Sequence, residues 1–268
     1  MPQRPAGAVT PDEILGFWFP DDLPDCVPER HGDFWNSRMQ GGMDAAIIDT
    51  YADVTLAAAR GAFDGWAETP RGRLALLLTL DQFPRSVWRD TPAAFAQDIK
   101  SCRLCLDGID NGHLKALTTP WERLFHLIAI GHCEGPDHLQ RMDLIVQLAD
   151  SMVVPLSPDF GILYDDAGKQ PRRVREVIAR FGHHPHRNAV LGRPSTPAEE
   201  AYIAEGDFPH ERKAERPDAA RGGNGAAPLA RLPGMLHLTL RHDIFIGWGT
   251  RQCWNWARTP TKPRRKAT

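Results

Sequence analysis

Residues 69–85 read TPRGRLALLLTLDQFPR and contain the strongest signal for the kind of fold this chain adopts. Thr69 and Pro70 predict a helix start, because a threonine hydroxyl caps free backbone N–H groups and proline suits the first helical position. The segment Leu74–Leu80 is apolar on nearly every face of such a helix. We therefore expect it to be central and buried, and to end before Pro84, which cannot continue a helix without losing a hydrogen bond.

The same Thr-Pro signal predicts further helix starts along the chain. It recurs at Thr10-Pro11, Thr91-Pro92, Thr119-Pro120 and Thr196-Pro197, and three of these sites extend to a capping box with Glu13, Glu122 and Glu199. Apolar residues at helical spacing follow, and no stretch shows the period-two alternation of strands. We expect helices at about Pro11–Phe19, Phe34–Gln40, Met43–Phe63, Pro70–Phe83, Pro92–Leu106, Pro120–Cys133, Asp137–Val153, Leu163–Phe181 and Pro197–Glu205.

These features predict an all-α fold. Short connections favour antiparallel neighbours, so we expect a single domain of stacked antiparallel helical hairpins over residues 11–208. Residues 211–233 are rich in Arg, Ala, Gly and Pro, which is typical of a disordered linker, and the apolar stretch Met235–Trp256 and a basic end follow. We interpret residues 209–268 as a linker and a poorly ordered C-terminal extension; the alternative is a tail that docks a partner or touches a membrane.

Composition excludes several classes of protein. The chain has 268 residues, 32 Lys and Arg against 34 Asp and Glu, and a net charge of −2. Nucleic-acid and membrane-surface binders are usually clearly basic, so neither kind of partner is expected. No apolar run reaches the roughly 18 residues that span a bilayer. Five scattered cysteines are no secreted disulfide framework, and we expect a cytoplasmic location by default.

Three clusters of polar residues lie at positions that are unusual for a helical core. The first, at the end of the buried helix, contains Asp81 and Arg85. The helix macrodipole disfavours a negative charge at that end, so Asp81 needs a cation and Arg85 is the local candidate. Two interpretations are open: a structural ion pair between helices, or an Arg85 guanidinium that binds an anion in a pocket.

The second cluster is His132-Cys133-Glu134. His132 continues the apolar stripe of its helix beyond Phe125 and Ile128, so its side chain should face the core. It is either a hydrogen-bonded core residue or, with Glu134, an acid/base pair whose pKa values are tuned by their surroundings.

The third cluster follows a helix end at residues 181–182. It consists of His183, His184, Pro185, His186, Arg187 and Asn188. Arg187 and Asn188 could cap exposed carbonyls or, with His186, line a site. Pro185 forces an extended backbone before it, which separates the imidazoles, and no second ligand pair is evident, so we expect neither a metal nor a cofactor.

Cys102-x-x-Cys105 lies within an expected helix rather than at its start. Redox motifs of this spacing sit at helix N-termini, where a thiolate is stabilised. The position favours two packed thiols instead.

The same clusters carry a family resemblance. The pieces are Ile14-Leu15-Gly16-Phe17-Trp18-Phe19, Gly72-Arg73-Leu74-Ala75-Leu76, Leu80-Asp81-Gln82-Phe83-Pro84-Arg85, Phe95-Ala96-Gln97-Asp98, Ala179-Arg180-Phe181-Gly182, Pro185-His186-Arg187-Asn188, Leu191-Gly192-Arg193 and Ser195-Thr196-Pro197. In this order, over about residues 12–204, they resemble the bacterial family called domain of unknown function 924. The resemblance implies a tetratricopeptide-like helical stack. The chain departs from the family's usual His-Ser-Glu at Cys133, from Asp-Gln at Leu139, and at His183 and His184.

Two functions from different classes follow from these residues. If the clusters converge, they form a polar pocket for a small anion, a carboxylate or a phosphate. His132 and Glu134 would then be the catalytic acid/base pair, and the substrate would be bound by Asp81, Arg85, His186, Arg187 and Asn188. The alternative is a tetratricopeptide-like scaffold that binds a protein partner without catalysis, with the clusters as staples between helices. The sequence leaves open whether the protein is an enzyme.

Overall fold

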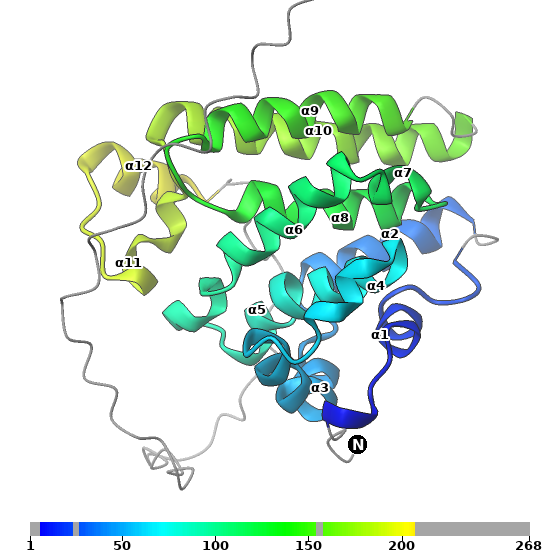
Figure 1. Ribbon diagram of the computed structural model, residues 1–268. Helices are drawn as coiled ribbons and strands as arrows, with labels where there is room; N and C mark the ends of the chain where they lie inside the picture. The colour runs from blue at the N-terminus through cyan, green and yellow to red at the C-terminus, as the bar shows by residue number, and fades with distance from the viewer. Residues whose placement is uncertain (1–5, 24–26, 154–157, 207–268) are drawn as a thin grey trace, which may run out of the picture. The chain divides into compact units, whose positions relative to one another are not determined.

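The computed structural model confirms the all-α fold (Figure 1). It describes residues 6–23, 27–153 and 158–206, and these contain no β-strand. Among these residues, no helix combines the length and the apolar character needed to cross a membrane. The chain divides into two units, Met1–Pro217 and Asp218–Thr268. The predicted linker and the apolar stretch after it lie outside the described residues.

The helices follow one another through short connections. They are α1 (Pro11–Trp18), α2 (Pro28–Met39), α3 (Asp44–Ala59), α4 (Pro70–Leu77), α5 (Pro84–Val87), α6 (Asp98–Asp110), α7 (His113–Ala116), α8 (Pro120–His132), α9 (His138–Val153), α10 (Pro158–Phe181), α11 (Asn188–Leu191) and α12 (Pro197–Glu205), with the shorter helical turns η1 (Ala6–Ala8), η2 (Asp64–Glu68), η3 (Leu78–Gln82), η4 (Pro92–Phe95) and η5 (Pro185–Arg187).

The threonine caps determine where several of these helices begin. All three predicted capping boxes form, at the starts of α1, α8 and α12. Thr69 caps α4 by accepting a hydrogen bond from the backbone N–H of Gly72 at 3.1 Å. The prediction at Thr91-Pro92 was wrong in detail: Pro92 begins only the turn η4, and α6 starts at Asp98, because Thr91 accepts no capping bond.

The buried helix lies at the centre of the described core, as predicted, and α4 packs against α1, α6 and α8. It does not run unbroken to Phe83. After Leu77 the backbone widens into the π-helical turn η3, which the N–H of Phe83 closes on the carbonyl of Leu78 at 3.0 Å. Pro84 has no N–H to continue the helical pattern. This wide turn carries Asp81, and π-helical turns often occur at functional sites.

An antiparallel arrangement is confirmed for one helix pair. Ion pairs join α9 and α10 between Asp143 and Arg175 at 2.5 Å and between Asp150 and Arg172 at 2.6 Å, so the two helices run in opposite directions. Figure 1 shows α10 lying along α9. The α6 and α8 helices also pack together. A tetratricopeptide-like arrangement of the whole stack remains a prediction.

Arg73 and Gly108 bring α4, α6 and α8 close together. The Arg73 guanidinium donates to His113 Nδ1 at 3.1 Å and to the carbonyls of Leu104 and Ala67 at 2.9 and 2.8 Å. Gly108 on α6 lies against the Arg73 side chain and has no room for a side chain of its own. An added Cβ would stand 2.5 Å from the His126 ring and 2.8 Å from Cδ of Arg73.

Replacing Gly108 by alanine should therefore destabilise the protein, although alanine is the better helix former. Overpacking of this kind costs about 1–3 kcal/mol in the free energy of unfolding, which urea denaturation would measure. Gly16→Ala on α1 is the matched control, because nothing lies within 4 Å of its Cβ position. Equal stability of the two variants would contradict the close approach of α6 to α8.

Candidate functional site

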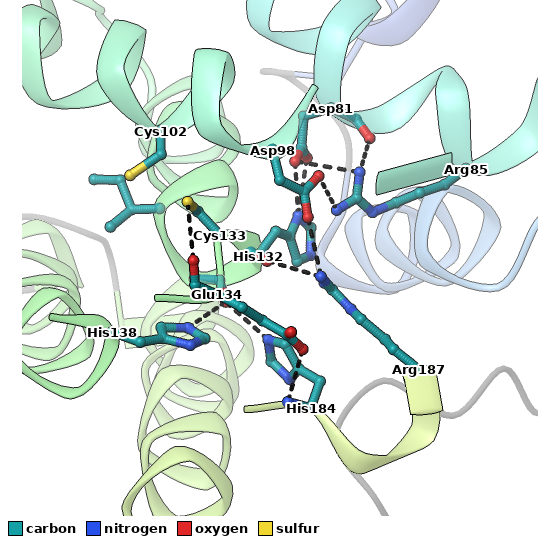
Figure 2. A network of polar contacts seen from close by, with 12 residues as sticks. Asp81, Arg85, Asp98, Cys102, His132, Cys133, Glu134, His138, His184 and Arg187 are labelled. Atoms are coloured by element: carbon teal, nitrogen blue, oxygen red, sulfur yellow. Dashed lines mark hydrogen bonds and ion pairs between the residues drawn. The ribbon is translucent and has the colours of Figure 1, made fainter. Parts of the chain in front are cut away.

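The centre of the site is the carboxylate of Asp98, the first residue of α6. Its Oδ1 accepts a hydrogen bond from Nη2 of Arg85 at 2.9 Å, and its Oδ2 accepts one from Nη1 of Arg187 at 3.0 Å (Figure 2). Both guanidinium groups also lie near the Phe95 ring, with Cζ atoms 5.7 and 4.5 Å from its centroid. The side chains of Asp98 and Arg187 are buried, at 8% and 4% exposure. One carboxylate thus joins α5, α6 and η5.

A second buried carboxylate, Asp81, completes the network. Its two oxygens lie 2.9 and 3.0 Å from Nδ1 of His132, and Oδ1 lies 3.4 Å from Nη1 of Arg85. Gln82 donates to Oδ2 at 2.5 Å. Burial alone would raise the pKa of Asp81, but Arg85 and His132 hold it well below its usual range, so the group is ionised.

His132 has a defined proton arrangement. Because the ionised Asp81 accepts from Nδ1–H, the lone pair of the neutral imidazole is on Nε2. Burial and the nearby Arg85 charge lower the pKa of His132, against the opposing effect of Asp81. A carboxylate that orients a histidine in this way is the arrangement used in general acid–base catalysis. The backbone carbonyl of His132 also accepts from Nη1 of Arg187 at 2.9 Å.

Glu134 has different partners from those expected. Its carboxylate accepts from Nη1 and Nη2 of Arg193 at 2.5 and 3.2 Å and from the backbone N–H of His184 at 2.9 Å. Burial would raise its pKa, but these hydrogen bonds and the charges of Arg187 and Arg193 lower it. His132 thus bonds to Asp81 rather than to Glu134, and the joint role of His132 and Glu134 as an acid/base pair stays a prediction.

Two histidines satisfy a single backbone carbonyl. Nε2 of His138 and Nε2 of His184 lie 2.9 and 3.0 Å from the carbonyl oxygen of Gly131, and the two rings are 5.3 Å apart. This carbonyl lies in the last turn of α8, where carbonyls have no partner within the helix. No group of three or more His, Cys, Asp or Glu within the described part of the chain is arranged to hold a metal ion.

The last two predicted residues lie beside the network. His186 is half-buried, with its ring 5.4 Å from that of His184, and burial followed by the charge of Arg187 lowers its pKa to about 3. Glu134 and His132 also act on it electrostatically. Asn188 instead donates to the hydroxyl of Ser195 at 3.1 Å.

The structure thus brings four of the predicted residues into one hydrogen-bonded network. They are Asp81, Arg85, His132 and Arg187. Sequence reasoning overlooked the acceptor that joins the two arginines, Asp98. A charge count could have found it, since two buried arginines with one local carboxylate leave a positive charge that needs a second acid.

This geometry defines a class of protein: an all-helical domain with a buried charged network at the ends of its helices. The chain belongs to a family described as bacterial protein of unknown function (DUF924), whose model matches residues 14–207. A solved structure of a protein of unknown function from Agrobacterium tumefaciens is similar, at 30% identity and a TM-score of 0.52. The match covers 73% of this chain and 97% of that one. Among curated proteins, none matches significantly.

Asp98→Asn should destabilise the protein strongly, because it leaves two buried guanidinium groups to share a neutral amide. Removing one partner of a buried ion pair costs about 3–5 kcal/mol, which chemical denaturation would measure. Asp110→Asn on the exposed end of α6 is the matched control and should change stability little. Similar values for both variants would contradict the central position of Asp98.

His138 predicts a pH dependence of stability. Burial lowers its pKa from 6.5 to about 4, so the unfolded chain binds its proton more readily than the folded one. The contribution of His138 to the free energy of unfolding should fall as the pH drops below the unfolded value of 6.5, by up to roughly 2 kcal/mol between about pH 7 and pH 5, and His186 should add to that fall.

The variant His138→Gln isolates this contribution, since a glutamine amide can donate to the Gly131 carbonyl but does not titrate. Urea unfolding of both proteins at the two pH values should show a flatter pH dependence in the variant. An unchanged slope would mean that His138 is not the group responsible.

Proposed function

We propose that the network binds a small anion, a carboxylate or a phosphate, through the guanidinium of Arg187. One observation carries the proposal: Nε of Arg187 is buried and has no hydrogen-bond partner. Buried donors in proteins are nearly always satisfied, so an unused one here indicates an acceptor supplied from outside.

The geometry of the arginine specifies the kind of acceptor. Arg187 uses Nη1 for both of its protein partners, Asp98 and the carbonyl of His132. The Nε and Nη2 donors form the other edge of the planar guanidinium, and such an edge matches two oxygens of a carboxylate or phosphate. The same ligand class was expected from the sequence, but with Arg85 and Arg187 as equal clamps. Arg85 now serves chiefly to hold Asp81 and Asp98.

The charge balance suggests how the ligand would be accommodated. Asp81 and Asp98 offset Arg85 and Arg187, so an incoming anion adds an uncompensated negative charge. His132 is a neighbour of Arg187, where the anion would bind, and an adjacent anion raises the pKa of an imidazole. Ligand binding should therefore be accompanied by proton uptake, and His132, oriented by Asp81, would exchange that proton with the bound molecule as an acid/base catalyst.

A protein-binding scaffold is the second candidate function. Two apolar side chains on α3, Ile48 and Leu56, are 43% and 38% exposed, and their spacing places them on one face of that helix. In this case the charged network would only fasten helix ends together.

Arg187→Lys tests the anion site, because lysine keeps the positive charge beside Asp98 but has no two-donor edge. Isothermal titration of the full chain with inorganic phosphate and with succinate should show binding that the variant weakens at least about tenfold, equivalent to about 1.4 kcal/mol. Arg103→Gln, an exposed arginine on α6, is the control and should bind as the wild type does.

Binding should also be tighter at about pH 6 than at about pH 8 because of the coupled proton uptake. Equal affinity of the wild type and the Arg187→Lys variant for both anions would overturn the anion site. Absence of any binding to the wild type would favour the scaffold.

A further inference from the structure

The cysteines of α6 do not pair in the way that their spacing suggests. Sγ of Cys105 donates to the carbonyl of His126 at 2.7 Å, and burial raises the pKa of this thiol well above its ordinary value. Cys102, one turn earlier, faces the end of α8 instead. Figure 2 shows Cys102 beside Cys133 at the end of α8, where a side-chain hydrogen bond links the two thiols, and Sγ of Cys133 also donates to the carbonyl of Glu134 at 3.6 Å.

The Cys102 and Cys133 pair joins two packed helices. Cys102 belongs to α6, Cys133 follows the last residue of α8, and these helices contact each other. Both thiols are free, with only 5% and 6% exposure. The packing of α6 against α8 thus brings together two sulfurs that are far apart in the sequence. Their low exposure leaves little access to any molecule larger than a few atoms.

A guanidinium stabilises negative charge on this pair. Nη1 of Arg141 donates to Sγ of Cys102 at 3.4 Å and to the carbonyl of Ile130 at 3.0 Å, which fixes its position. The hydrogen bond from Cys102 lowers the pKa of Cys133 to about 7. The charge of Arg141 acts in the same direction, whereas burial opposes it. A thiolate with a neighbouring thiol is the form of cysteine that reacts with oxidants.

We infer that Cys102 and Cys133 are a dithiol–disulfide pair that reacts with a hydroperoxide small enough to reach them. The Cys133 thiolate attacks one peroxide oxygen and the O–O bond breaks. The hydroxide that leaves takes up the proton that Cys133 had released, giving water and a Cys133 sulfenic acid. The Cys102 sulfur then attacks the Cys133 sulfur and loses its proton, a second water leaves, and a disulfide remains. Two thiols are oxidised and the peroxide is reduced to water.

Tryptic digestion separates the relevant cysteines. Cleavage after Lys100 and Arg103 places Cys102 in the peptide 101–103 and Cys105 in the peptide 104–115, while Cys133 lies in the peptide 124–141. The full chain would be treated with hydrogen peroxide, alkylated, digested and analysed by mass spectrometry. The expected product is peptide 101–103 joined to peptide 124–141, with reversal by dithiothreitol.

Two variants make the assignment specific. Cys105→Ser should still form the crosslink, whereas Cys102→Ser should leave a Cys133 sulfenic acid that dimedone traps, since no resolving thiol remains. If Cys102 and Cys133 of the wild type are both still alkylated after treatment, or if the crosslink involves peptide 104–115 instead, the inference is wrong. The wild-type peptide map decides this even if a variant fails to fold. The chemistry is independent of whether an anion binds at Arg187.

Discussion

The shared carboxylate of Asp98 is the interaction on which the candidate site depends. A guanidinium or carboxylate taken out of water is costly unless a partner compensates its charge, so the burial of Arg187 depends on this acid, and that of Arg85 depends on it together with Asp81. Because each oxygen serves a different arginine, α5, α6 and η5 are held in a fixed relation. From these arginines the hydrogen bonds extend to Asp81 and to the end of α8 at His132.

The same burial gives the network its chemical character. It keeps the imidazoles of His132 and His186 neutral under conditions where exposed histidines begin to protonate, while charge pairing keeps Asp81 ionised. A balanced, buried set of charges with one unused donor on Arg187 is therefore responsive to an added charge. In such surroundings, a bound anion and a proton on His132 would stabilise each other.

Residue type alone did not assign the roles of the histidines and cysteines. His132 bonds to a carboxylate, whereas His138 and His184 both bond to the carbonyl at Gly131. Cys102 is close to Cys105 in the sequence, but its partner in space is Cys133. The difference in each case comes from whether the side chain meets an unpaired backbone group or another side chain at the junction of two helices.

The helical class, the capped helix starts such as that at Thr119, the buried central helix and the family could all be predicted from the amino-acid sequence. These depend on interactions among residues three or four positions apart, which a linear pattern records. The partners of the charged groups became known only from the three-dimensional structure. His132 bonds to Asp81 across 51 positions, and Arg187 bonds to Asp98 across 89. No local rule specifies such pairs, because they depend on which helix ends the packing of the core brings together.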